Sequence, residues 1–147
     1  MNIISIYTDG ACSGNPGSGG WGVVIISNGE ISEFSGGEID TTNNRMELKA
    51  AIEGIRKAPQ CDSLKLFTDS KYVKDGITNW IMNWKENNWK TASKKNVKNQ
   101  DLWKELDFLT TQHTINWQWV KAHQLTNDEH SVFNNIADEL ARNAIPS

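Results

Sequence analysis

The sequence has few cysteines and no long apolar run. Its 147 residues include only Cys12 and Cys61, and neither belongs to a C-x-x-C pair. That scarcity argues against a disulfide framework and against a cysteine-based zinc site. No apolar run approaches the roughly eighteen residues of a membrane span, and the chain shows no basic, apolar leader. These absences predict free thiols, a cytoplasmic location and no membrane partner.

The overall composition is that of an ordinary globular protein. Hydrophobic residues make up 37% of the chain and charged residues 22%, both close to the averages for soluble domains. A chain of this length can bury a substantial core in one domain. We therefore expect a single domain over residues 1–147, acting as a monomer.

Charge is unevenly distributed along the chain. Residues 71–98 hold seven lysines against two acids, a net charge of +5, whereas residues 1–70 (five basic, nine acidic) and 99–147 (three basic, seven acidic) each carry −4. An acidic body with one basic segment is typical of a protein that places metal-binding carboxylates in one region and binds a polyanion with another.

The first apolar stretch ends in a carboxylate. Ile4, Ile6 and Thr8 alternate with more polar residues, which predicts a short strand with Asp9 at its end. A glycine-rich stretch follows from Gly10 and predicts a loop whose backbone can approach a ligand closely. A carboxylate beside such a loop could hold a metal ion against a phosphate. The alternative is an ordinary Asp-Gly turn.

An antiparallel hairpin and an amphipathic helix are predicted next. Trp21 to Ser27 forms a second strand, and the turn signal Asn28-Gly29 leads into a third, Ile31 to Gly37. Capping candidates between Thr41 and Asn44 then precede a helix that ends before Pro59. Its apolar residues recur at helical spacing: Leu48, Ala51, Ile52 and Ile55.

Glu47 lies at the edge of that helix's core-facing stripe, because it precedes Ala51 by one turn. A carboxylate there requires a partner. Glu47 is either a capping-box residue three positions after Asn44 or a metal ligand, and helix position alone does not separate these alternatives.

Two further acids follow the same logic. Asp69 comes directly after a predicted strand, Leu64 to Thr68, and is either the N-cap of a helix from Lys71 to Ile77 or a second strand-end carboxylate. Asp138 lies on a C-terminal helix, half a turn away from its apolar stripe. Its local alternative is an acid near a helix N-terminus.

The remaining pattern predicts a basic projection, a helix and a fifth strand. From Asn79 to Lys98 tryptophans alternate with lysines, which is typical of a surface that contacts a nucleic-acid backbone, although the tryptophans could also belong to the core. Helical spacing resumes at Leu102, and Thr114 to Val120 alternates as a strand.

Seven blocks of the sequence together resemble the bacterial type 1 class of ribonuclease H. They are T-D-G-A-C-S-G-N-P-G, T-T-N-N-R-M-E-L, F-T-D-S-K-Y-V, G-I-T-N-W, N-W-K-E-N-N-W-K, V-K-N-Q-D-L-W, and V-K-A-H with A-D-E-L-A. They stand in that class's order and cover nearly the whole chain. The resemblance implies an α/β fold in which a five-stranded mixed sheet, three antiparallel strands then two parallel strands, is flanked by helices.

The resemblance also implies the catalytic residues. Asp9, Glu47, Asp69 and Asp138 match the acidic tetrad, with Asp9 bridging two metal ions, and His123 matches a residue that assists leaving-group protonation or product and metal release. Two Mg²⁺ ions about 4 Å apart can activate water and hold the leaving oxygen during phosphodiester hydrolysis. Carboxylate oxygens are the ligands such hard cations prefer. We expect two Mg²⁺ ions with substrate, and Mn²⁺ as an alternative.

Substrate contacts are likewise implied by resemblance. The side chains of Asn15, Asn43 and Asn44, the backbone of Cys12, and Lys71, which replaces a frequent glutamine, match groups beside the RNA strand, where the 2'-hydroxyl distinguishes RNA from DNA. Thr42 and Asn99 match a pocket for a phosphate of the DNA strand, with Trp80 and Trp84 near its sugars. The projection extends this surface through Lys85, Trp89, Lys90, Lys94 and Lys95.

The sequence departs from the family pattern at a few positions. Asp40 replaces a frequent basic residue near the DNA phosphate pocket, and Glu86-Asn87-Asn88 dilutes the charge of the projection. Ala122 replaces the usual glycine before His123, and the segment from His123 to Asp138 is longer than usual.

The sequence therefore predicts an endonuclease that cuts the RNA strand of RNA/DNA hybrids and leaves 5'-phosphate and 3'-hydroxyl ends. One alternative is a non-catalytic hybrid-binding module, which would gain nothing from clustered acids facing a phosphate backbone. Another is a DNA nuclease or recombinase, which the asparagine set does not support.

Overall fold

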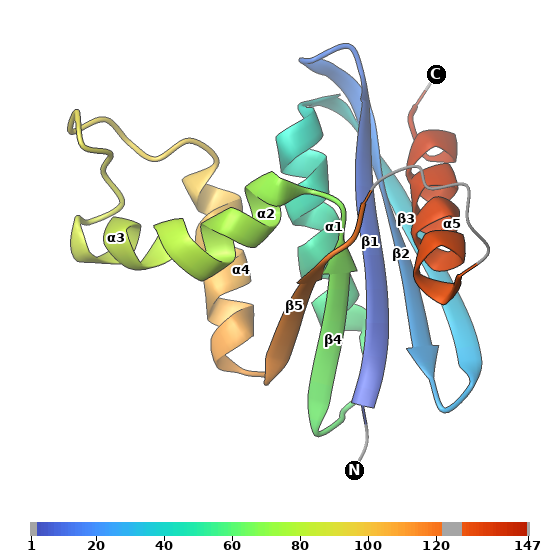
Figure 1. The fold of residues 1–147 in the computed structure, drawn as a ribbon. Coiled ribbons are helices and arrows are strands. Elements are labelled where there is room, and N and C mark those ends of the chain that lie inside the picture. Colours follow the sequence, from blue (N-terminus) through green and yellow to red (C-terminus); the bar gives the residue numbers. More distant parts are fainter. Residues whose placement is uncertain (1–2, 122–127, 147) are drawn as a thin grey trace.

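The computed structural model describes residues 3–121 and 128–146. Within these residues five strands form one mixed sheet in the order β3-β2-β1-β4-β5 (Figure 1). The strands are β1 (Ile3–Ser13), β2 (Gly17–Ser27), β3 (Glu30–Thr41), β4 (Ser63–Thr68) and β5 (Ile115–Trp119). The first three pair antiparallel, β4 runs parallel to β1, and β5 runs parallel to β4. The predicted sheet is confirmed.

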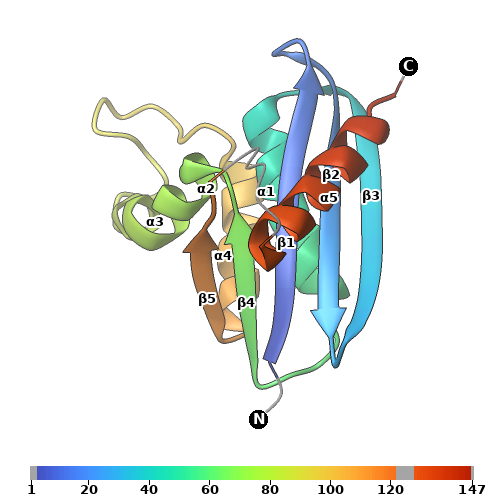
Figure 2. The same ribbon diagram turned by 45° about the vertical axis from the view of Figure 1, so that its right-hand side comes forward.

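Helices cover both faces of the sheet, with α1 and α4 on one face and α5 on the other (Figures 1 and 2). The helices are α1 (Asn43–Lys57), α2 (Lys71–Asp75), the π-helix η1 (Gly76–Trp80), α3 (Ile81–Glu86), α4 (Gln100–Thr111) and α5 (Glu129–Asn143). No described helix combines the length and apolar character needed to cross a bilayer.

Alternation along β1 gives each face its own core. Ile4 and Ile6 are buried in the larger cluster under α1 and α4. Tyr7 faces the other way and stacks on Phe67 of β4, with ring centroids 4.5 Å apart, in the smaller cluster under α5. Because successive strand residues point to opposite faces, Asp9 lies on the same face as Tyr7.

The hairpin between β2 and β3 has the predicted turn. Asn28 and Gly29 both have positive φ angles, 52° and 82°. Two consecutive positive φ angles match the twist of a two-residue β-hairpin. The sequence signal for this turn is therefore confirmed.

The prediction that the first strand ends at Asp9 was wrong. β1 continues to Ser13, and its pairing with β2 runs through Asp9 opposite Gly22 to Ser13 opposite Ser18. The glycine-rich stretch is therefore mostly sheet, with a short connection between the two strands. Asp9 lies inside a strand rather than at its end.

The basic segment, residues 71–98, is more helical than predicted. The helix expected to end at Ile77 continues through η1 and α3 to Glu86. At the start of η1 a Cβ on Gly76 would lie 2.0 Å from the Trp103 ring, so the absence of a side chain lets the segment pack directly on α4. Only its second half is a loop.

Candidate active site

Asp9 and Asp69 lie side by side because of the strand register. Thr8 of β1 pairs with Thr68, the last residue of β4, so the next residue of each chain segment is an aspartate. β1 continues past this point while β4 stops, which leaves Asp9 flanked by β2 on one side. Asp69 is held through its backbone, since the Trp119 indole N–H donates to its carbonyl oxygen at 3.1 Å.

The cap alternative for Asp69 is excluded by its neighbour. Ser70 is the N-cap of α2, and its side chain accepts a hydrogen bond from the Val73 backbone N–H at 3.2 Å. The Asp69 carboxylate is therefore not needed to satisfy the helix end.

Glu47 is likewise free of a capping role. Thr42 is the N-cap of α1 and accepts a hydrogen bond from the Arg45 backbone N–H at 3.2 Å. Arg45, not Glu47, therefore occupies the capping-box position. Glu47 is 6% exposed, and its Oε1 has no hydrogen-bond partner. A buried carboxylate oxygen without a partner is unfavourable unless a cation or proton meets it.

Asp138 lies on α5, which covers the face of the sheet opposite to α1 (Figures 1 and 2), and its side chain lies close to Asp9. It is the tenth residue of α5, which begins at Glu129, so the local alternative of an acid near a helix N-terminus does not hold. A Cβ on Gly22 would lie 2.3 Å from the carbonyl oxygen of Ala137. The absence of that Cβ lets α5 lie directly on β2, opposite Asp9.

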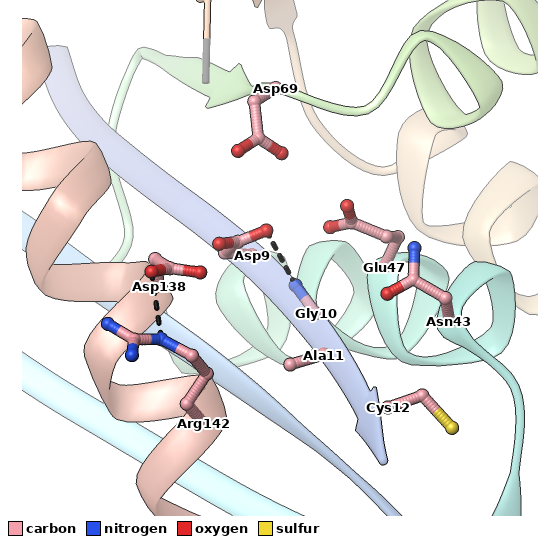
Figure 3. A pocket seen from close by; sticks show the side chains of 9 residues that line it. All are labelled: Asp9, Gly10, Ala11, Cys12, Asn43, Glu47, Asp69, Asp138 and Arg142. Carbon is pink, nitrogen blue, oxygen red and sulfur yellow. Dashed lines mark hydrogen bonds and ion pairs between the residues drawn. The ribbon is translucent and has the colours of Figure 1, made fainter. Parts of the chain in front are cut away.

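The four carboxylates surround one open cavity of about 380 Å³ (Figure 3). One oxygen each from Asp9, Glu47 and Asp69 lie within 4.8 Å of one another. Asp138 faces Asp9 across the cavity, and its Oδ2 accepts a hydrogen bond from Arg142 Nε at 3.0 Å. We call Asp9, Glu47, Asp69 and Asp138 the acid cluster.

Electrostatics within the acid cluster favour bound protons when no cation is present. Burial, followed by the charges of Glu47 and Asp69, raises the pKa of Asp9 to about 11. Burial and the charge of Asp69 also raise the pKa of Glu47 well above its usual value. Carboxylates this close cannot all ionise without a cation, so a divalent metal ion would replace protons here.

The residues present fit a hard divalent cation. Each member of the acid cluster offers oxygen ligands, which Mg²⁺ prefers. The buried Oε1 of Glu47, which has no hydrogen-bond partner, is available as a ligand for such an ion. Among the described residues, no cysteine or histidine is part of the close group of possible metal ligands.

Known protein families and sequences include clear relatives of this chain. The family model described as RNase H matches residues 1–146. A protein named Ribonuclease H from Maricaulis maris is 56% identical over 146 residues, covering 99% of this chain and 95% of the relative. The chain belongs to the ribonuclease H family.

Solved ribonuclease H structures share the fold. LC9-RNase H1, described as a type 1 RNase H with the type 2 active-site motif, superposes with a TM-score of 0.83 and is 31% identical, covering 99% of this chain and 72% of that one. LC11-RNase H1, solved in complex with an RNA/DNA hybrid, has a TM-score of 0.70 at 24% identity, over 97% of this chain and 96% of that one. The second likeness shows the fold alone.

The residues predicted to contact substrate fall into two cavities and one surface. Asn43 and Cys12 line the cavity of the acid cluster. A second cavity of about 320 Å³ is lined by Asn15, Pro16, Thr42, Asn44, Lys98 and Asn99. The three predicted RNA-strand asparagines lie together, since the Asn43 backbone N–H donates to Asn15 Oδ1 at 3.1 Å, and Asn15 and Asn44 also line the cavity of the predicted phosphate-pocket residues.

Asn99 is fixed in the second cavity by its neighbours. It has a left-handed backbone (φ 62°), its Oδ1 accepts from Arg45 at 3.3 Å, and its Nδ2 donates to Tyr72 Oη at 3.1 Å. Thr42 contributes its hydroxyl to the α1 cap. Arg45 is in turn held by both carboxylate oxygens of Asp101, at 2.8 and 3.0 Å.

The aromatic residues of the basic segment form a row. Trp80 lies 5.9 Å from Trp84, and Trp84 lies 6.1 Å from Trp89, between ring centroids. Trp84 and Trp89 pack against the core, whereas Trp80 is exposed. The alternative that these tryptophans belong partly to the core therefore holds for the last two, and Trp80 presents a ring to solvent.

The lysines around this row are exposed. Lys85 pairs with Asp107 at 3.3 Å, and Lys90 donates to Asn96 across a short loop. Lys94 and Lys95 are exposed on that loop. Lys71, at the other end of the segment, lies over the Trp119 ring, 5.1 Å from its centroid, next to Asp69.

His123, the predicted helper in catalysis, lies outside the described residues. The histidine after it, His130, sits in the first turn of α5. Its Nδ1 is 2.6 Å from Tyr7 Oη, and its ring centroid is 4.6 Å from that of Phe67. His130 therefore helps pack α5 on the sheet.

Sequence reasoning missed the polar neighbours of the acid cluster on α5. Arg142 follows Asp138 by four residues, and Asn134 precedes it by four, so all three share one face of the helix. That spacing was available as a signal.

Proposed function

We propose that this chain is a metal-dependent endonuclease that hydrolyses the RNA strand of RNA/DNA hybrids and leaves 5'-phosphate and 3'-hydroxyl ends. The observation that carries the proposal is the convergence of four carboxylates, from β1, α1, the end of β4 and α5, on one cavity. Membership of the ribonuclease H family supports it. The preferred ions are two Mg²⁺, with Mn²⁺ as the alternative.

The carboxylates would bind the cations in different ways. Asp9 lies between Glu47 and Asp69 on one side and Asp138 on the other (Figure 3), which favours it as the bridging ligand. When bound, the two ions supply an activated water and stabilise the leaving 3'-oxygen. Cation binding would release the protons that the raised pKa values of Asp9 and Glu47 retain.

Arg142 would balance the negative charge from the rim of the cavity. Its guanidinium holds Asp138 in place and stays exposed. A cation in that position lies within reach of a substrate phosphate, to which guanidinium groups bind well.

We propose that the two cavities and the basic segment hold the two strands of the hybrid. Asn43 and the backbone of Cys12 lie beside the acid cluster and suit contacts to the RNA strand. The cavity lined by Asn15, Asn44, Thr42 and Asn99 offers amide and hydroxyl groups of the kind that bind a phosphate. The exposed Trp80 and the lysines beyond it would extend the contact to the DNA backbone.

The proposal includes a single domain over residues 1–147 that acts as a monomer, because one chain supplies every carboxylate of the site. The two thiols, Cys12 and Cys61, are both free, which is consistent with a reducing compartment such as the cytoplasm. Sedimentation of the purified protein with and without hybrid tests the monomer.

A cleavage assay tests the activity. End-labelled RNA/DNA hybrid, duplex RNA and duplex DNA are each incubated with the protein, with Mg²⁺, with Mn²⁺ and with chelator. We expect cleavage of the RNA strand of the hybrid alone, and only with a divalent cation. Binding of the hybrid without cleavage under every metal condition would favour the non-catalytic module, and cleavage of duplex DNA would favour the DNA nuclease.

A further inference from the structure

Asn134 is an unusual residue for its place on α5. Its side chain is 2% exposed, on the face of the helix that packs against the sheet beside the fully buried Ala137 and Ala141. A buried amide is unfavourable unless its polar atoms are paired. An apolar residue of similar size would fill this position at lower cost, so the amide calls for a specific role.

The amide of Asn134 is paired on one side only. Its Nδ2 donates to Asp69 Oδ2 at 3.4 Å, whereas its Oδ1 is buried and has no hydrogen-bond partner. Among the described residues, the hydrogen bond of this side chain therefore joins α5 to a carboxylate of the acid cluster that lies at the end of β4, 65 residues away in the sequence.

The hydrogen bond from Asn134 to Asp69 lies on the same face of α5 as the hydrogen bond from Arg142 to Asp138. Asn134 precedes Asp138 by one turn, and Arg142 follows it by one turn, so the three side chains line the same face of α5. Arg142 donates to Asp138, and Asn134 donates to Asp69. One helix thus supplies a metal-ligand candidate together with a hydrogen-bond donor for each of two carboxylates.

We infer that Asn134 is a positioning residue for Asp69: its amide fixes the orientation of that carboxylate so that the other carboxylate oxygen faces the cation site. This inference rests on the proposed function, because it assigns Asn134 a role toward the metal that the acid cluster would hold. A donor to one oxygen of a carboxylate limits rotation of the group. Mutation of a group that orients a metal ligand in this way typically lowers metal affinity or activity by about 10- to 100-fold.

Substitutions of Asn134 separate positioning from packing. Asn134→Ala removes the donor and part of the volume, whereas Asn134→Leu removes the donor, keeps a similar branched shape and adds no charge. Asn143→Ala is the matched control, because it makes the same change as Asn134→Ala at the exposed C-terminal end of the same helix.

The experiment measures Mg²⁺ binding by calorimetry on the hybrid-free protein, thermal unfolding in chelator, and single-turnover cleavage at saturating hybrid across a Mg²⁺ titration. We expect Asn134→Ala to weaken Mg²⁺ binding by about tenfold, toward the lower end of the range because one long hydrogen bond is lost. Cleavage should then need correspondingly more Mg²⁺. Asn143→Ala should match the wild type in both measurements.

Each outcome decides the inference. A loss of thermal stability with unchanged Mg²⁺ affinity would make Asn134 a packing residue and overturn the inference. If Asn134→Ala fails to fold, Asn134→Leu carries the test, and its Mg²⁺ affinity must fall below that of the wild type. Wild-type protein that binds no Mg²⁺ and cuts no hybrid would instead contradict the proposed function, so the two failures are distinguishable.

Discussion

The acid cluster and the basic segment are built in opposite ways. The cluster gathers side chains from four elements, and Asp9 and Glu47 are almost completely buried. The basic segment is one continuous stretch, residues 71–98, whose lysines are mostly exposed and whose charged groups have few partners among the described residues. The first depends on the whole fold, and the second on local sequence.

This difference predicts how the metal-binding and the polyanion-binding residues each affect folding stability. Like charges brought together in a buried site oppose folding until a cation arrives. Exposed lysines add attraction for a polyanion with little effect on stability, and salt screens that attraction. Catalysis should therefore be sensitive to single changes in the cluster, whereas affinity should respond to changes in the segment only when several are combined.

The largest expected effect is the loss of cleavage in Asp9→Asn. A neutral amide keeps the shape but loses the charge that would hold two cations. We expect cleavage to fall at least about 1000-fold, which corresponds to about 4 kcal/mol of transition-state stabilisation. Hybrid affinity, measured in parallel by a binding titration, should change little. Appreciable Mg²⁺-dependent cleavage by this variant would remove Asp9 from the centre of the mechanism.

The next effect concerns His123 and His130 and tests whether a histidine contributes to catalysis beside the carboxylates. We expect His123→Ala to lower turnover by roughly 10- to 100-fold, within or below the range of a proton-transfer group, when measured at saturating hybrid. His130→Ala should change turnover little, because His130 contacts Tyr7 and Phe67 instead of the cavity. A more damaging effect at His130 would contradict the assignment of His123.

A smaller effect is expected in the basic segment. Replacing Lys90, Lys94 and Lys95 together with alanine should weaken hybrid binding by about tenfold and leave turnover at saturation nearly unchanged. Each lost phosphate contact removes about one counterion from the salt dependence, so the slope of log affinity against log salt should flatten by up to about 3. Lys65→Ala, an exposed change on β4, is the control. An unchanged slope in the triple variant would mean that these lysines do not contact phosphates.

The smallest effect is on stability and follows from the raised pKa of Asp9. In the metal-free folded protein this pKa is about 11, against about 4 in the unfolded chain. The folded state therefore binds a proton that the unfolded state releases, and stability falls as pH rises between these values. We expect Asp9→Asn to unfold at a temperature several degrees higher than wild type at pH 8 in chelator. In a domain of this size each kcal/mol of unfolding free energy shifts the unfolding temperature by about 2–4 °C.

The same measurement contains its own control. At pH 4 the advantage of Asp9→Asn should shrink, because the folded wild type then carries the proton and the unfolded wild type is already about half protonated. Adding Mg²⁺ should stabilise the wild type more than the variant, since a ligand that binds only the folded state raises its stability. Equal unfolding temperatures at pH 8 in chelator would mean that Asp9 is not under electrostatic strain.

Much of the fold was predictable because its signals are local. The Asn28-Gly29 turn and the apolar periodicity of α1 each depend on neighbouring residues, and both gave the correct element. The end of β1 was not predictable in this way. Glycines there indicated a loop, but Gly20 instead serves the close approach of α5 to the sheet, and that approach is a contact between residues far apart in sequence.

The site required more than local pattern. Local pattern also allowed a capping-box role for Glu47 and an N-cap role for Asp69. In the structure the N-cap residues are Thr42 and Ser70 instead. Family resemblance, which carries information about distant contacts, had favoured the metal-ligand reading. Asn134 escaped notice because its partner, Asp69, lies on another element.

The place of Asp9 inside β1 has a consequence for motion. Its backbone belongs to the central strand and lies opposite Gly22 of β2, and amides paired inside a sheet exchange with solvent mainly when a large part of the sheet opens. Asp69 and Asp138, at a strand end and on an outer helix, belong to parts that open more readily. We therefore expect local fluctuations that admit or release a cation to displace Asp69 and Asp138 more than Asp9.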